Sequence, residues 1–419
     1  MHVLFVHPNY PAQFGHVGHH LAQTRGWRCT FVSETPAHAR RNVGELGGSV
    51  EKLRYQPRGG ATKQNHFCSR TFENTIWHCD GVLRALMQRE DIQPDLIVGH
   101  SGFGSTLFLR EHFPDVPCVN LFEYYYHPHG PDSDMTFRSD LGWPVRPEKF
   151  LRSRCRNAMI LLDLQNCEVG YCPTAFQKSR FPKEYADKLS VVFDGIDTDV
   201  WKPIDTAQRP RTIGGVTLPA GAKVVTYCSR GFESMRGFDL FMRGMSRLLK
   251  RRDDVHVLIA GTDRVAYGGD AEHTGGKSFK EWTMAMPDVR DIDRSRLHFL
   301  DRLPPTDLAT MLAGGDLHVY LTVPFVLSWS MINAMSCGAT VLASDTPPVR
   351  DAITHGETGL LFDSFDPDAL ADAADQVLAD PSAHRHLGRA ARERVLREFS
   401  LDATMPQMID LFERAQSLA

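Results

Sequence analysis

Two arginines stand in a short loop whose setting suits the binding of an anion. Arg230 and Arg236 lie six positions apart in the stretch 228–237, between an apolar run at 223–227 and an amphipathic stretch at 238–250. Guanidinium groups match phosphate oxygens in a two-pronged way, and their fixed charge stabilises a departing diphosphate. The loop therefore predicts a site that binds a diphosphate. The alternative is a solvent-exposed turn that carries two surface arginines.

A second loop leads into a helix start that would serve the same chemistry. The apolar run 317–321 is followed by Ser328 and Ser330, and either serine can cap a helix that ends near Gly338. The N–H groups and the dipole at such a helix start favour phosphate. The alternative is an ordinary buried cap, in which Trp329 belongs to the core.

The elements that position these loops follow one repeated pattern of a short apolar run, a loop of small residues and an amphipathic stretch. Such alternation predicts an α/β protein with two Rossmann-like, doubly wound parallel-sheet domains that face each other across a cleft. Ligands of these sheets lie beyond the carboxyl ends of the strands. The stretch 194–221, rich in Asp, Pro and Gly, is the predicted linker. The apolar runs are at 3–6, 29–32, 95–98 and 118–121, then 223–227, 255–260, 297–300, 317–321 and 340–343.

Length, charge and cysteine content limit the classes of protein. At 419 residues the chain is long enough for two cores, and its net charge of −4 argues against a nucleic-acid partner. Nine scattered cysteines fit reduced thiols in a cytoplasmic protein, and neither a signal peptide nor a membrane span is expected. Arg152, Arg154 and Arg156 precede an apolar run, so weak contact with the inner face of an anionic membrane stays open beside an ordinary solvated helix.

These segments together resemble a bacterial subgroup of glycosyltransferase family 4, whose members are retaining enzymes with the GT-B fold. The resemblance is carried by the donor-site signature in the second half, by a hinge run and by two stretches typical of the subgroup. The signature covers 333–338, 341–344 and 356–361, the hinge covers 192–203, and the subgroup stretches are 7–14 and 324–330.

The resemblance implies a role for each part of the chain. Residues 1–200 would form the acceptor-binding domain and residues 201–400 the nucleotide-sugar domain, with a C-terminal helix at 401–419 expected to cross back. Arg230 and Arg236 match the family's diphosphate-binding Arg and Lys. The other positions implied at the donor site are Gly15, Gly261, Thr262, Arg302, Leu303, Leu327, Ser328, Trp329, Ser330 and Asn333.

The chain departs from the family pattern at two positions. The family usually carries two glutamates eight positions apart, one near the donor sugar and one on the ribose, and here Phe325 and Asn333 stand in their places. Asn333 can still hydrogen-bond a ribose hydroxyl, whereas Phe325 cannot support a charged transition state. Glu123, where many members place an active-site histidine, is the first candidate to take over. Otherwise activity is weak or lost.

The first half also offers residues for an acceptor. Tyr124, Tyr125 and His127 belong to an aromatic run that could stack against a sugar, or could simply pack. Asp132 and Asp134 have the spacing of a metal-binding DxD motif but do not follow a strand, so no metal site is expected. The histidines around the first loop are also more typical of structural residues than of metal ligands; they are His7, His16, His19 and His20.

The prediction is therefore a retaining glycosyltransferase that moves a sugar from a nucleotide diphosphate sugar to a glycan, lipid-linked or small-molecule acceptor. Arg230 and Arg236 would neutralise the leaving group without a metal or other cofactor, and Glu123 would stabilise positive charge on the sugar. Two alternatives stay open. One is a sugar-nucleotide-binding relative that has lost activity, and the other is a GT-B epimerase or phosphorylase.

Overall fold

A computed structural model describes residues 1–34, 49–103, 106–130, 133–205, 210–363 and 365–418. The chain divides into two compact units, which are described separately below. The first contains residues 1–136, 144–194 and 404–419, and the second contains 137–143 and 195–403. The chain therefore passes between the units four times, and the short segment 137–143 is part of the second unit.

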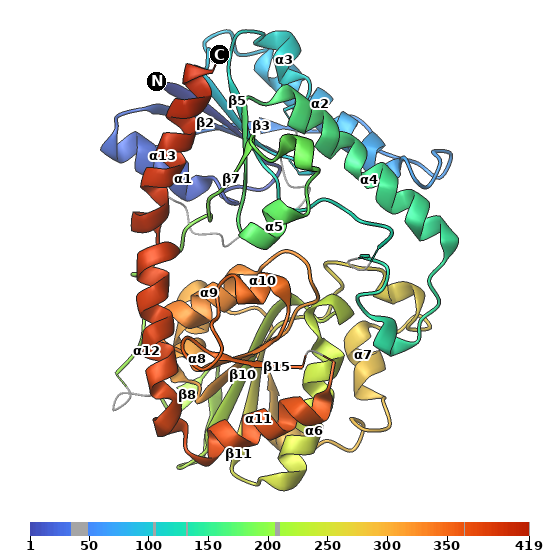
Figure 1. The fold of residues 1–419 in the computed structure, drawn as a ribbon, viewed down its shortest axis with the longest axis vertical. Helices are drawn as coiled ribbons and strands as arrows, with labels where there is room; N and C mark the ends of the chain where they lie inside the picture. The colour runs from blue at the N-terminus through green and yellow to red at the C-terminus, as the bar shows by residue number, and fades with distance from the viewer. Residues whose placement is uncertain (35–48, 104–105, 131–132, 206–209, 364, 419) are drawn as a thin grey trace. The chain divides into compact units, whose positions relative to one another are not determined.

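The first unit is built on a seven-stranded, wholly parallel sheet with the order β3-β2-β1-β4-β5-β6-β7. Figure 1 labels four of these strands, β2, β3, β5 and β7. The strands are β1 (His2–Val6), β2 (Arg28–Glu34), β3 (Glu51–Tyr55), β4 (Leu96–His100), β5 (Cys118–Leu121), β6 (Val169–Cys172) and β7 (Leu189–Val191). The helices are α1 (Gly15–Thr24), α2 (Arg70–Leu86), α3 (Leu109–His112), α4 (Pro147–Asn166), α5 (Ala175–Ser179) and most of α13 (Leu401–Ser417), with a 3-10 turn at Lys183–Tyr185.

The central strands of this sheet are buried on both faces, which explains their continuous apolar sequence. Every residue of β1, β4 and β5 is buried. The C-terminal helix α13 contributes to this core, because the ring of Phe412 lies 6.4 Å from that of Phe5 on β1.

The second unit is built on a six-stranded parallel sheet with the order β12-β11-β10-β13-β14-β15. The strands are β10 (Lys223–Gly231), β11 (Val255–Thr262), β12 (Leu297–Phe299), β13 (Leu317–Tyr320), β14 (Val341–Ser344) and β15 (Leu360–Phe362), beside a small hairpin of β8 (Thr212–Ile213) and β9 (Val216–Thr217). The helices are α6 (Phe238–Arg251), α7 (Phe279–Met284), α8 (Pro305–Gly314), α9 (Trp329–Ser336), α10 (Pro347–Arg350), α11 (Pro367–Ala379) and α12 (Pro381–Glu398). Short 3-10 turns lie at Ser139–Leu141, Ser234–Arg236, Asp270–Glu272 and Arg294–Arg296.

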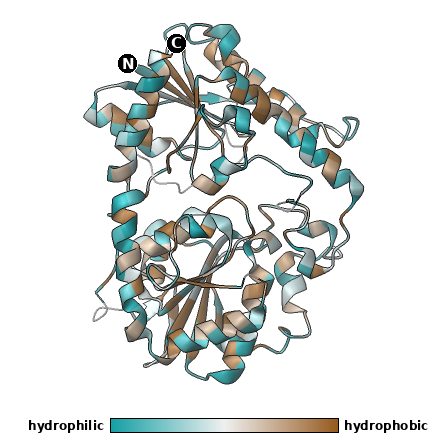
Figure 2. Ribbon diagram, viewed as in Figure 1, coloured by the Kyte–Doolittle hydropathy of each residue, from teal (hydrophilic) through white to brown (hydrophobic). Residues whose placement is uncertain are grey.

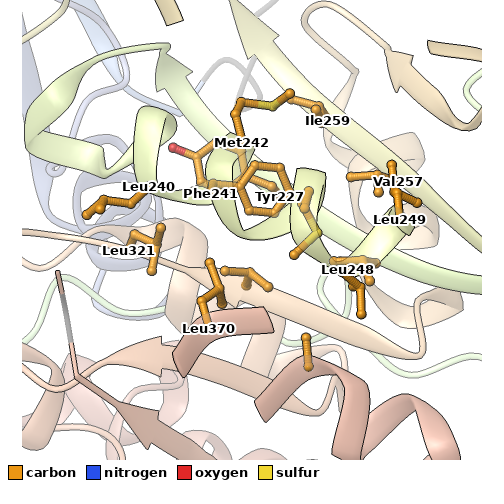
Figure 3. Close-up of a cluster of buried hydrophobic side chains, with 14 of the residues drawn as sticks. Tyr227, Leu240, Phe241, Met242, Leu248, Leu249, Val257, Ile259, Leu321 and Leu370 are labelled. Carbon is orange, nitrogen blue, oxygen red and sulfur yellow. The ribbon is translucent and has the colours of Figure 1, made fainter. Parts of the chain in front are cut away.

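The core of the second unit lies between its sheet and α6. Tyr227 on β10 stacks on Phe241 of α6 with ring centroids 4.5 Å apart, and Leu370 of α11 closes the same cluster (Figure 3). Figure 2 shows the strands of this unit as mainly hydrophobic, while the helices carry hydrophilic residues as well. Sheet and helix therefore bury apolar side chains together and hold the loops at the carboxyl end of β10 in place.

Each sheet has one point where successive connections leave in opposite directions. In the first unit the chain goes from β1 to β2 on one side and later to β4 on the other, and in the second unit β10 has β11 and β13 as its two neighbours. The crevice at the carboxyl ends of such a strand pair is the usual ligand site of an open parallel sheet. We call this point the switch point of the sheet. Arg236 lies at the switch point of the second sheet, and His7, His100 and Glu123 lie at that of the first.

Candidate functional site

Arg236 lies at the switch point of the second sheet. It ends the 3-10 turn that follows β10, and its side chain reaches the residues that follow β13. Its Nη1 donates to Thr322 Oγ1 at 2.7 Å, to the carbonyl oxygen of Val326 at 3.1 Å and to Tyr320 Oη at 3.3 Å. The cation is 8% exposed. Three bonds through one nitrogen fix the orientation of the guanidinium plane.

The other edge of this guanidinium is left for a ligand. Within the described residues, Nε and Nη2 of Arg236 form no hydrogen bond to protein. Neither nitrogen is among the fully buried atoms without a partner, so this edge of a largely buried side chain is open to solvent. A planar Nε–Nη2 edge matches two oxygens of a phosphate or carboxylate. The ring of Tyr267, 5.6 Å from the guanidinium carbon, adds a cation–π contact on one face.

The turn that carries Arg236 is held by buried acids. Asp270 accepts hydrogen bonds from the amide and the hydroxyl of Ser234, at 2.7 and 2.6 Å. Glu233, which is 1% exposed, accepts from the amides of Ala266 and Tyr267 and so holds the loop that bears the Tyr267 ring. Burial raises the pKa of Glu233 to about 7, although these amide bonds act in the opposite direction.

Arg230 does not share the environment of Arg236. Its side chain is exposed at the end of β10, and its backbone oxygen accepts from Thr262 Oγ1 at 2.8 Å. Among the described residues no hydrogen-bond partner is common to the two guanidinium groups. The predicted convergence of two arginines thus stays a prediction for Arg230, whereas Arg236 is already oriented.

The start of α9 is partly capped by its own residues. The Ser328 hydroxyl accepts from the amide of Ser330 at 3.3 Å, and the amide of Ser328 donates to Tyr320 Oη at 3.1 Å. Leu327 is buried, and its amide forms no hydrogen bond to any described residue. Trp329 is 36% exposed and thus not a core residue. Capping leaves fewer N–H groups for phosphate than a bare helix start would offer.

Asn333 on α9 is buried with an unpaired oxygen. The side chain is 8% exposed, and its Oδ1 finds no hydrogen-bond donor among the described residues. A buried acceptor without a partner is costly, so a ligand hydroxyl would stabilise it. Phe325, by contrast, is buried and packs edge-on against Tyr267 at 5.6 Å between ring centroids.

Four further residues of the predicted donor site lie at the carboxyl ends of β11 and β12: Gly261 and Thr262 end β11, whereas Arg302 and Leu303 follow β12. Gly261 has φ +151°, and a Cβ there would meet the carbonyl oxygen of Ser229 at 2.3 Å, so only glycine fits between these strands. The amide of Gly261 donates to the carbonyl of Asp301 at 2.8 Å. Thr262 and Leu303 are half-buried and Arg302 is exposed. These residues lie at the same edge of the sheet as Arg236.

The switch point of the first sheet gathers a carboxylate and two histidines. His7 follows β1, His100 ends β4 and Glu123 follows β5. Glu123 Oε1 accepts from Gln13 Nε2 at 3.0 Å and lies 3.6 Å from His100 Nε2. Gly15, expected to approach the donor, is the buried first residue of α1, which follows the loop of Gln13.

The charge of Glu123 is stabilised by its neighbours. Burial is the largest single effect and opposes ionisation, but His100, His7 and Gln13 together outweigh it, and the pKa of Glu123 is lowered. Burial likewise opposes the charged form of His100, yet Glu123, the Ser101 carbonyl and Asp194 together outweigh it, and the pKa of His100 is raised. The two groups therefore favour each other's ions.

The aromatic run after Glu123 is largely committed to internal contacts. Tyr124 is 6% exposed and its hydroxyl donates to Asp134 at 2.6 Å, which leaves its ring little surface for a sugar. His127 pairs through Nε2 with the carbonyl of Arg180 at 2.6 Å, and its amide donates to Asp134. Tyr125 is half-buried, with its ring 5.6 Å from that of His127.

The metal-binding alternative finds no additional support. Asp134 takes up the hydroxyl and amide just described, whereas Asp132 lies outside the described residues. Within the part of the chain that the structure describes, no three His, Cys, Asp or Glu side chains gather as a metal-binding group.

Three residues of these clusters were not among the sequence-based candidates: His100, Glu233 and Tyr267. Position at the carboxyl end of a predicted strand or in the loop after it could have indicated His100 and Glu233. Tyr267 carries no such signal, because it reaches Arg236 through a loop held by Glu233.

Two family models match adjoining parts of the chain. The model described as Glycosyl transferase family 4 group matches residues 25–201, and that described as Glycosyl transferases group 1 matches residues 211–394. The chain belongs to glycosyltransferase family 4. It is therefore an enzyme that transfers a sugar, as the sequence predicted.

The names of two curated relatives of this family 4 chain include a small molecule. D-inositol 3-phosphate glycosyltransferase of Corynebacterium glutamicum is 27% identical over 80% of this chain and 76% of the relative. Alpha-maltose-1-phosphate synthase of Mycolicibacterium smegmatis is 24% identical over 57% of this chain and 59% of the relative.

Solved structures confirm the fold of the family 4 chain. Sucrose-phosphate synthase of Thermosynechococcus elongatus matches with a TM-score of 0.73 at 18% identity, over 100% of this chain and 99% of that one. The Anabaena protein HepE, solved with UDP and glucose, matches with a TM-score of 0.68 at 13% identity, over 98% and 99%. Two parallel α/β units and these likenesses confirm the predicted GT-B fold. No helix among the described residues combines the length and the apolar sequence that a membrane span requires.

Proposed function

We propose that this family 4 enzyme transfers a sugar from a nucleotide diphosphate sugar with retention of the anomeric configuration. One observation carries the proposal. Arg236 is buried and fixed through Nη1, while its Nε–Nη2 edge is unpaired among the described residues at the switch point of the second sheet. A guanidinium oriented in this way is a two-pronged donor to a diphosphate.

The reaction needs stabilisation of charge at two places. As the bond from the sugar to the diphosphate breaks, negative charge grows on the leaving oxygen and positive charge on the sugar ring. Arg236 of the second unit would stabilise the negative charge on the leaving oxygen, since its guanidinium is oriented before the substrate arrives. Asn333 Oδ1 is available to a ribose hydroxyl.

Glu123 of the first unit is proposed to stabilise the positive charge on the sugar ring. Its side chain is 21% exposed, and its Oε2 forms no hydrogen bond to a described residue. An anion that faces outward can stabilise an oxocarbenium-like sugar. Phe325 cannot do this, so Glu123 takes the place of the carboxylate that the family usually carries there.

We propose a carbohydrate or small polyol as the acceptor, in a free, glycan or lipid-linked form. The activities for which the relatives are named support the small-molecule form. The exposed side chains of Arg152 and Arg154 on α4 support weak contact with an anionic membrane, which co-sedimentation with anionic and neutral vesicles would test.

Donor identity should be found first by thermal shift. A ligand that binds only the native state raises its melting temperature, so UDP-, GDP-, ADP- and dTDP-sugars are compared with the free nucleotides. The stabilising donor is then offered with a panel of acceptors, and the anomeric configuration of the product is read by NMR. An inverted product would refute retention.

The decisive variant is Arg236→Ala. We expect a fall in kcat/KM of at least about 100-fold, because a preorganised donor to the leaving group is lost. Arg290→Ala removes an exposed arginine of the same unit and should leave kcat/KM within about twofold. Equal kcat/KM values for wild type and Arg236→Ala would contradict the role assigned to Arg236, and with it the proposal.

The buried Phe325 favours one second candidate, a relative that binds sugar nucleotides without turning them over. Donor binding by calorimetry with neither transfer nor hydrolysis above background would support that candidate. Transfer to an acceptor, rather than isomerised donor or phosphorolysis of a glycan, separates the transferase from an epimerase or a phosphorylase.

A further inference from the structure

His100 lies at the centre of the charged cluster in the first unit. It ends β4 at the sheet's switch point and is 1% exposed. Its Nδ1 lies 2.9 Å from the carbonyl oxygen of Ser101, and its Nε2 lies 3.6 Å from Glu123 Oε1. Both ring nitrogens therefore face oxygen atoms.

The two distances limit where protons can be. A carbonyl oxygen only accepts, so Nδ1 carries a proton. A neutral ring would then turn the lone pair of Nε2 towards the carboxylate oxygen, which is repulsive. The 3.6 Å between Nε2 and Oε1 is too long for a hydrogen bond but within the range of an ion pair. One further proton would remove the repulsion, either on Nε2 as an imidazolium or on Glu123 as a carboxylic acid.

The neighbours of Glu123 decide between these two arrangements. Gln13 Nε2 donates to the same Oε1 at 3.0 Å, and a donor stabilises the ionised carboxylate. The other titratable groups that act on the pair are His7, with its ring centroid 5.3 Å from that of His100, and Asp194 and Tyr171. The Asp194 carboxyl favours a charged His100.

Only one oxygen of the Glu123 carboxylate is used by its neighbours, and the other one indicates what role the His100 and Glu123 pair could have. His100 and Gln13 both act on Oε1, whereas Oε2 has no hydrogen bond from a described residue. The Glu123 side chain keeps 21% of its surface exposed. The arrangement fixes the carboxylate through Oε1 and leaves Oε2 for a ligand.

We propose that His100 is a positioning residue, a buried imidazolium that keeps Glu123 ionised and directs its Oε2 towards a sugar bound at the switch point of the first sheet. The inference rests on the proposed function, because it assigns the outward oxygen to the sugar. His100 itself touches no substrate. Its effect is to keep the Glu123 carboxylate charged down to a lower pH than an isolated side chain would allow.

The protonation state is tested directly, without any activity assay. In protein with 15N-labelled histidine, the ring nitrogens are followed by NMR from pH 5 to 9, and His100→Gln assigns the His100 signals. We expect a doubly protonated ring at pH 7 in the wild type. In Glu123→Gln, which keeps the shape of the side chain, the titration of His100 should move down by more than about one pH unit.

His2 is the matched control for this measurement. It is also buried in the first unit, at the opposite end of β1, and its ring nitrogens pair with Gln93 and Thr30 rather than with a carboxylate. Its titration should be the same in both proteins. A neutral His100 in the wild type at pH 7, or one unchanged by Glu123→Gln, overturns the proposal.

The link to catalysis is tested by the pH dependence of kcat. In His100→Gln the acidic limb should move up by about one unit, with the donor KM within about twofold, since Glu123 loses its counter-charge. His2→Gln should keep the wild-type profile. A uniform loss of kcat at every pH would indicate a purely structural role and would contradict the proposal.

The two hypotheses fail separately. If no donor and acceptor pair gives a product, the proposed function is wrong, while the NMR titration still decides the state of the His100 and Glu123 pair. If transfer occurs and His100 is neutral, only the positioning role is wrong.

Discussion

Arg138 and Asp239 form a buried two-pronged ion pair. Nη1 and Nη2 of Arg138 donate to the two carboxylate oxygens of Asp239 at 2.9 and 2.6 Å, with 7% and 0% of the side chains exposed. Nη1 also donates to the carbonyl of Ser234, in the turn that ends at Arg236. The segment 137–143 is thereby joined to the second unit, beside the donor loop.

Removing one partner of this pair should destabilise the second unit. Arg138→Leu leaves the Asp239 carboxylate buried without its cation, and we expect a loss of about 3–5 kcal/mol in the free energy of unfolding. Urea unfolding measures it. Arg138→Leu combined with Asp239→Leu should recover part of the loss, because no charge is then left buried. Additive losses would contradict this account of the pair.

Glu233 should make stability depend on pH. Its pKa rises from an ordinary 4.5 to about 7 on folding, so the folded state binds more protons than the unfolded state between these values. Stability from this group is thus complete below pH 4.5, falls as pH rises to about 7, and is then constant. The fall is roughly 3 kcal/mol. Glu233→Gln should remove it, as seen by urea unfolding at pH 5 and 8, whereas the exposed Glu357→Gln should not.

Gly261→Ala should disturb the junction of β10 and β11. The new Cβ would clash with the Ser229 carbonyl oxygen, in addition to the strain of a φ of +151°. We expect a lower melting temperature and a higher KM for the donor. Gly221→Ala is the control, since its φ of +80° is also strained but its Cβ would meet open space. Equal effects of the two variants would show that the clash is relieved.

Chelation should leave the reaction unchanged. If Arg236 neutralises the leaving diphosphate, initial rates with EDTA in excess should match those with added Mg²⁺ within about twofold. Rates are measured on wild type and on Arg236→Lys, which retains the charge but loses the planar fork. A rate that falls with EDTA and returns with Mg²⁺ would show that a metal shares this role.

Part of the site could be predicted because it depends on local pattern. The apolar runs at 3–6 and 223–227 form β1 and β10, and Arg236 follows the second of them as expected. The helix start at Ser328 was predicted from residue type alone, and Ser328 does cap α9. Strand β3 was not predicted, since only one of its five residues is buried and its sequence lacks an apolar run.

The sequence by itself determined the two parallel sheets, the edge at which their ligand loops lie and the arginine of the second loop, because periodicity and turn chemistry depend on near neighbours. The tertiary structure decided which distant side chains meet. It brought His100 to Glu123 through the order of β1, β4 and β5. It also joined Arg138 to Asp239 through the segment 137–143, which belongs to the second unit although both of its flanks belong to the first. Such pairs depend on strand order and packing across the chain, and no local pattern encodes them.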